Sequence, residues 1–81
     1  MTDSERTLLK NSIDQVVDLE TTGGDRHLAQ ILFVFDEGET PDAFYLKVTA
    51  NTDGTFTPEP GRGHSILLSD IAAVRRYHEP T

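Results

Sequence analysis

The chain contains no cysteine, and this absence excludes disulfides, thiolate metal sites and a cysteine nucleophile. The lack of cysteine is also typical of a reducing compartment. No apolar run approaches the about 18 residues that a membrane-spanning helix needs. The first residues lack the basic segment of a secretory signal peptide. We therefore expect a cytoplasmic protein that does not associate with membranes.

Basic residues are also scarce, since 7 Lys and Arg stand against 14 Asp and Glu, for a formal net charge of −7. A negative domain repels phosphate backbones, which argues against general affinity for nucleic acids. A chain this short buries only about 60–65% of the surface that it exposes when unfolded, so its core is thin. We expect residues 1–81 to form one small domain, stabilised by a closed sheet, a covering helix or a partner subunit.

The acids are concentrated between Asn11 and Asp42, where eight of them accompany one base, Arg26. Such a stretch indicates a surface that docks on a basic partner protein. The alternative is a solvated surface that keeps the protein soluble. The candidate partner-binding acidic face consists of Asp14, Asp18, Glu20, Asp36, Glu37, Glu39 and Asp42.

The last third of the chain is more basic and contains a glycine-flanked arginine. Glycines beside Arg62 let backbone N–H groups approach an anion, and the guanidinium offers a planar fork to phosphate or carboxylate. Arg75 and Tyr77 share one strand face, which suits stacking on a base. The alternative is a flexible turn and an edge strand that its charges protect from aggregation. The candidate anion or nucleic-acid patch consists of Gly61, Arg62, Gly63, Arg75, Arg76 and Tyr77.

The N-terminal part predicts a short helix followed by a segment that fits two structures. Residues 3–10 form the helix, with Asp3 or Ser4 as its cap. Residues 12–22 fit a strand, because they are β-branched at 16–17 and precede a Gly23-Gly24 turn. A helix over 4–19 that ends at Gly23 is the alternative.

The remainder predicts short strands separated by turns. Strands are expected over 26–35, 44–50, 55–57, 65–68 and 73–77, with an exposed loop at 36–42 and a single tight turn at 69–71. In the strand 26–35 both faces are apolar, with Phe33 and Phe35 on the face of Ile31, so we expect it to be covered on both sides. In the strand 44–50 we expect Phe44 to share the face of Val48.

The stretch 65–74, a strand that leads through one turn with Ile71 into a final strand, resembles the end of SH3-like and Sm-like barrels. The segment from Leu19 through the Gly23-Gly24 turn to Ile31 is similar to the opening hairpin of that fold. With a leading helix, the order resembles Hfq-type regulators and the Rof family of Rho inhibitors. The resemblance implies a mainly β (α+β) fold, with a short N-terminal helix and a five- to six-strand antiparallel small barrel. A long N-terminal helix packed on an open antiparallel sheet is the alternative.

Catalytic and metal-binding signatures are missing from the sequence. The histidines at 27, 64 and 78 lack the paired spacing of zinc ligands. His64 and Ser65 are adjacent on a strand, so they point to opposite faces and cannot act together. We therefore expect no enzyme activity, no metal and no cofactor.

These observations favour a non-enzymatic interaction module, a small acidic regulator or inhibitor that binds a basic partner protein. One alternative is an Sm-like or SH3-like nucleic-acid-binding protein that uses the basic C-terminal third. Another is a binder of small anions or nucleotides at a subunit interface, which requires a homo-oligomer.

Overall fold

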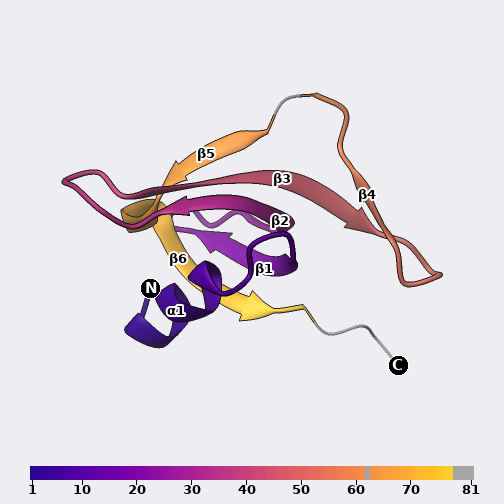
Figure 1. Ribbon diagram of the computed structural model, residues 1–81. Helices are drawn as coiled ribbons and strands as arrows, with labels where there is room; N and C mark the ends of the chain where they lie inside the picture. The colour runs from indigo at the N-terminus through magenta and orange to yellow at the C-terminus, as the bar shows by residue number, and fades with distance from the viewer. Residues whose placement is uncertain (62, 78–81) are drawn as a thin grey trace.

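The computed structural model describes residues 1–61 and 63–77, and these form a mainly β structure (Figure 1). One helix is followed by six antiparallel strands and a 3₁₀ turn, η1. The elements are α1 (Asp3–Lys10), β1 (Val16–Thr21), β2 (Arg26–Phe35), β3 (Asp42–Ala50), β4 (Phe56–Pro58), β5 (His64–Leu67), η1 (Leu68–Asp70) and β6 (Ile71–Arg76). No helix in these described ranges has the length and apolarity to cross a bilayer.

The short N-terminal helix is confirmed, and the longer helix over 4–19 is wrong. The N-cap of helix α1 is Thr2, whereas Asp3 or Ser4 was expected. The Thr2 Oγ1 accepts from the Glu5 N–H at 3.1 Å, and the Glu5 Oε1 accepts from the Thr2 N–H at 3.1 Å. The helix ends with Asn11 as its C-cap. Beyond it, Asp14 adopts the left-handed conformation with φ of 65°, which redirects the chain into β1.

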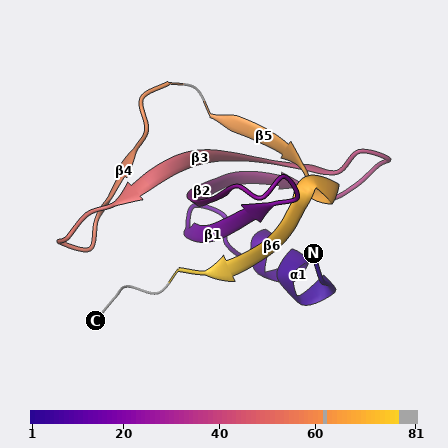
Figure 2. The ribbon, with the colours of Figure 1, turned by 180° about the vertical axis from the view of Figure 1, so that it is seen from behind.

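The strands pair in the order β4-β3-β2-β1-β6, and β5 pairs with the first half of β3. Within the described residues no ladder joins β6 to β4 or β5, so the sheet is open. The turn η1 makes hydrogen bonds to the start of β3 and to the end of β1. The Leu68 N–H donates to the Pro41 carbonyl at 2.9 Å, and the Asp70 carbonyl accepts from the Thr22 N–H at 2.9 Å. Helix α1 packs beside β6, as Figure 2 shows from behind.

The core lies on one face of the sheet, and η1 and α1 contribute to it. Its largest fully buried side chains are Leu9, Val17, Leu19, Ile31, Leu68 and Ile71. They come from α1, β1, β2, η1 and β6, so the core depends on segments far apart in the chain.

The expectation that β2 is covered on both faces is wrong. Phe33 and Phe35 are 58% and 46% exposed, although they alternate with the buried Ile31 in the sequence. A β-bulge between Ile31 and Phe33 shifts the register with β3. One extra residue reverses the side-chain alternation, so Val34 turns toward the core and the two phenylalanines turn toward solvent.

Candidate functional site

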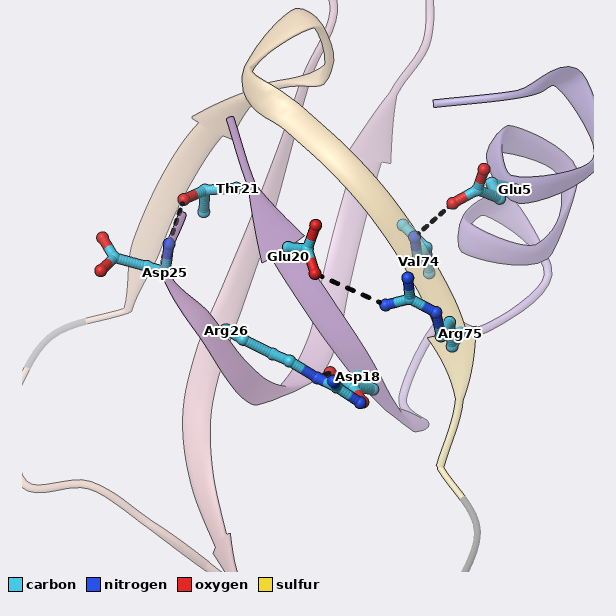
Figure 3. Close-up of polar contacts among 8 residues, drawn as sticks. All are labelled: Glu5, Asp18, Glu20, Thr21, Asp25, Arg26, Val74 and Arg75. Atoms are coloured by element: carbon cyan, nitrogen blue, oxygen red, sulfur yellow. Dashed lines mark hydrogen bonds and ion pairs between the residues drawn. The ribbon is translucent and has the colours of Figure 1, made fainter. Parts of the chain in front are cut away.

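Two of the predicted acidic residues lie on the outer face of β1 and are paired within the molecule. The Asp18 carboxylate accepts from the Arg26 Nε at 3.0 Å through both oxygens, and the Glu20 Oε1 lies 3.8 Å from the Arg75 Nη1 (Figure 3). The hydrogen bond from Arg26 lowers the pKa of Asp18. These carboxylates stabilise the β2–β1–β6 surface and present little free charge to a partner.

A third predicted acid, Asp36, attaches the β2–β3 loop to the helix. Its carboxylate lies 3.0 Å from the Lys10 Nζ and 3.5 Å from the Arg6 Nη1. The Asp36 side chain is only 18% exposed, so two cations of α1 cover it. Asp36 therefore holds the start of the loop in place and is not part of an open acidic surface.

The other four predicted acids have no ion pair among the described residues. Asp14 lies alone in the connection between α1 and β1. Glu37 and Glu39 are exposed in the β2–β3 loop, and Asp42 begins β3. We call Glu37, Glu39 and Asp42 the acidic loop. The acidic face predicted from sequence is thus reduced to this cluster and the separate Asp14.

An exposed apolar patch lies on the solvent face of β2, β3 and β5. The bulge in β2 places Phe33 opposite Phe44, and Asp42 of β3 lies between Phe35 of β2 and Leu67 of β5. Paired residues on neighbouring strands project from the same face. We call this set the apolar patch: it consists of Phe33 (58% exposed), Phe35 (46%), Phe44 (42%) and Leu67 (41%). Phe44 and Val48 lie on the same face of β3, as expected, because the extra residue of the bulge is in β2 and β3 itself alternates regularly. The two ends of that face differ in exposure, since Phe44 is 42% exposed and Val48 is 7% exposed.

Gly63 lies directly under the Phe44 ring. A Cβ at this position would stand 2.6 Å from the Phe44 Cζ and 3.3 Å from the Tyr45 carbonyl oxygen. The absence of a side chain at Gly63 thus leaves the space that the Phe44 ring occupies before β5. Gly63 was a candidate for anion binding from its sequence, and in the structure it has a packing role beside the apolar patch.

The apolar patch and the acidic loop form one continuous surface. Asp42 of the acidic loop connects the two, because its side chain shares a face with Phe35 and Leu67 of the apolar patch. The hydrogen bond from Leu68 to Pro41 fixes the end of the loop against the end of β5. The sequence contained both halves of this surface, but the bulge that exposes the phenylalanines has no distinct sequence signal.

Of the predicted anion patch, Arg75, Arg76 and Tyr77 line one hollow of about 440 Å³, whereas Gly61 and Gly63 lie in the connection between β4 and β5. Arg75 pairs with Glu20, and the Tyr77 ring packs edge-on against Phe56 with centroids 5.3 Å apart. Arg76 is exposed and, with Tyr77, lines a hollow of about 400 Å³ beside α1. Gly61 lies in an exposed loop with φ of 123°. Arg62 lies outside the described residues.

Three aromatic rings stack across β2, β3 and β5. The His27 and Tyr45 ring centroids are 5.5 Å apart, and those of Tyr45 and His64 are 5.6 Å apart. The His27 Nε2 is buried and has no hydrogen-bond partner among the described residues. Burial lowers the pKa of His27, and the charge of Lys47 adds to this effect. In the same ranges no group of His, Asp and Glu is placed to hold a metal ion.

We expect the neutral His27 to make the fold less stable as the pH falls. The unfolded chain binds a proton near the ordinary histidine pKa of 6.5, whereas the native state binds it only at lower pH. Native stability is therefore lost as the pH drops through 6.5. Replacing His27 by Phe retains the stack and removes the unsatisfied nitrogen. Urea unfolding at pH 7.5 and 5.5 should show a smaller difference for His27→Phe than for the wild type; an equal difference contradicts this role.

Among the described residues, the acidic loop and the apolar patch form an exposed surface whose carboxylates make no ion pair. The carboxylates on β1, Arg75 and Tyr77 make contacts within the fold, while Asp14 and Arg76 are exposed elsewhere. Comparison of the chain with protein-family models, curated proteins and solved structures found no match.

Proposed function

We propose that this chain is a non-enzymatic protein-interaction module, a small acidic regulator or inhibitor of a partner that presents apolar side chains among Lys and Arg. The observation that carries the proposal is the apolar patch of three phenylalanines and one leucine, bordered by the three carboxylates of the acidic loop. Contiguous exposed apolar surface with a polar rim is typical of protein interfaces.

The two parts of this surface have different physical roles in binding. Covering the aromatic side chains removes apolar area from water, which contributes about 25 cal/mol per Å². The carboxylates attract a basic partner over a distance of about 8–10 Å at ordinary salt, and they raise the association rate more than the final affinity. A regulator that must find a basic target quickly gains from this combination.

We further propose that the sheet is a small barrel of the SH3-like or Sm-like kind. The support is the order of the elements: β1, a bulged β2 and β3 pair in succession, and a 3₁₀ turn precedes a last strand that returns to β1. The contacts of η1 with both Pro41 and Thr22 bring the two sides of the sheet together. This fold hosts many functions, so it does not decide among them.

Nucleic-acid binding has less support than protein binding. Arg75 already pairs with Glu20, and the Tyr77 ring already packs on Phe56, so the stacking pair proposed from sequence is occupied. The net charge of −7 opposes a phosphate backbone.

The experiment is a capture from the source lysate after nuclease treatment, at low and moderate salt. The immobilised proteins are the wild type, the double variant Phe33→Ser/Phe44→Ser and the control Ile13→Ser. Ile13 is 39% exposed outside the apolar patch, so the control makes the same kind of change elsewhere. We expect a discrete protein on the wild type and the control that is lost on the double variant. A protein that the double variant retains, or nuclease-sensitive capture alone, contradicts the proposal.

A further inference from the structure

Two of the three strands that end the sheet have an evident protection against further pairing. Pro58 in β4 has no N–H to offer to another strand. At β6, the outward N–H of Val74 donates to the Glu5 Oε2 of helix α1 at 2.7 Å (Figure 3). Natural proteins use proline and covering helices in this way to block strand addition.

The outer edge of β5 has no such protection from residues 1–61 or 63–77. The strand reads His64-Ser65-Ile66-Leu67, without proline or a charged Lys, Arg, Asp or Glu, and within the described residues it pairs only with β3. Figure 1 shows β5 at the periphery of the sheet, on the side away from α1. His64, Ser65 and Leu67 are all exposed, which agrees with an uncovered edge.

The register identifies the backbone groups that face outward from β5. The Leu68 N–H donates to the Pro41 carbonyl, and these two residues continue the register of β5 with β3. Pro41 and Leu68 are therefore a hydrogen-bonded pair. Hydrogen-bonded and non-hydrogen-bonded pairs alternate along an antiparallel ladder. The pairs of Leu67 with Asp42 and of Ser65 with Phe44 are therefore non-hydrogen-bonded. The N–H and C=O groups of Ser65 and the N–H of Leu67 therefore point away from β3, whereas the Leu67 C=O is at the N-cap of η1 and takes part in that turn.

We propose that the β5 edge accepts an extended segment of the partner protein as an additional strand, with apolar residues in its centre and Lys or Arg at its ends. This inference rests on the proposed function and specifies the partner. Residues of the added strand opposite Ser65 and Leu67 lie on the same face as the apolar patch. The basic end of the added strand that lies beside Leu67 meets the acidic loop, which the contact of Leu68 with Pro41 holds at that end of β5.

Charge favours such a segment over a second copy of this chain. Each copy carries a net charge of −7, and β5 lies beside the acidic loop. Pairing two copies through β5 brings like charges together, which is unfavourable. A basic segment neutralises the same carboxylates.

The probe is a blocked heptapeptide with Val-Thr-Val between two Lys-Lys pairs, titrated into the full chain at low salt. Two further peptides carry backbone N-methyl groups, either on both valines or on the threonine. N-methylation removes a donor and leaves side chains and charge unchanged. In the proposed register the valine N–H groups face Ser65 and Leu67. We expect about tenfold or more loss of affinity for the valine-methylated peptide and less than about threefold for the other.

A pair of protein variants tests the same edge. Leu67 has φ of −67° and ψ of 141°, which proline adopts without strain, and its N–H makes no ladder bond. Leu67→Pro therefore removes the outward donor, whereas Leu67→Ala removes the side chain and keeps the donor. We expect Leu67→Pro to bind the heptapeptide about tenfold or more weakly than Leu67→Ala.

The outcomes separate the two proposals. Equal binding by Leu67→Pro and Leu67→Ala, with no effect of either N-methylation, overturns strand addition. If strand addition is overturned but Phe33→Ser/Phe44→Ser still abolishes capture, the proposed function stands without strand addition. A dimer of the chain that Leu67→Pro dissociates, together with no binding of the heptapeptide, assigns the edge to a second copy and also overturns the inference.

Discussion

Replacing Leu68 by Ala is expected to lower the free energy of unfolding by about 2–5 kcal/mol, because the change leaves a cavity in the core. Leu68 is 1% exposed and begins the turn that leads from β5 to β6. The same residue donates its N–H to Pro41, so its side chain and backbone both hold η1 against the sheet. A small domain has only about 5–15 kcal/mol of total stability, so this single change removes a large part of it. Urea denaturation followed by circular dichroism measures the effect.

The neighbouring Leu67→Ala is the matched control for this prediction. It deletes the same side chain one residue earlier, but Leu67 is 41% exposed. Its effect on the free energy of unfolding should therefore stay within about 0.5 kcal/mol. Equal losses from the two variants would mean that η1 does not anchor the core as described.

Neutralising the two outermost acids of the acidic loop, in the variant Glu37→Gln/Glu39→Gln, is expected to weaken heptapeptide binding by about tenfold at low salt. Both side chains are exposed and lack an ion pair among the described residues, so their field acts on the partner. The difference from the wild type should shrink as salt screens the charges. Isothermal titration calorimetry at two salt concentrations measures both effects.

The control Asp18→Asn/Glu20→Gln changes the net charge by the same amount at a different place. These two carboxylates already interact with Arg26 and Arg75, so their loss also exposes two cations. We expect this variant to retain affinity within about threefold. A larger loss of affinity in Asp18→Asn/Glu20→Gln than in Glu37→Gln/Glu39→Gln would place the binding surface on the outer face of β1 and contradict the role of the acidic loop.

Local signals predicted most of the secondary structure. The helix over 3–10 has an acidic first turn, and the β-branched pair Val16-Val17 followed by Gly23-Gly24 identified the β1–β2 hairpin. Such preferences act within a few residues and do not depend on the rest of the fold. The 3₁₀ turn before the last strand was likewise predicted, displaced by one residue.

The parts that sequence reasoning missed are set by contacts between distant segments. The bulge between Ile31 and Phe33 reverses the faces of β2, and because residues 31–35 are apolar on both faces, the sequence pattern gives no sign of it. The pairing of Asp36 with Lys10 joins residues whose proximity depends on how α1 packs against the sheet. For this reason the sequence predicted one acidic face, whereas in the structure some of its carboxylates form ion pairs and others do not.

An NMR titration of the isotopically labelled chain with the Lys-Lys-Val-Thr-Val-Lys-Lys heptapeptide, followed through the backbone amide shifts, tests most directly whether the apolar patch, the acidic loop and the β5 edge form the binding surface. We expect the largest changes at Phe33, Phe44, Ser65, Leu67 and the acidic loop. Changes concentrated instead at Arg75, Arg76 and Tyr77, or spread over the paired carboxylates of β1, would contradict this expectation.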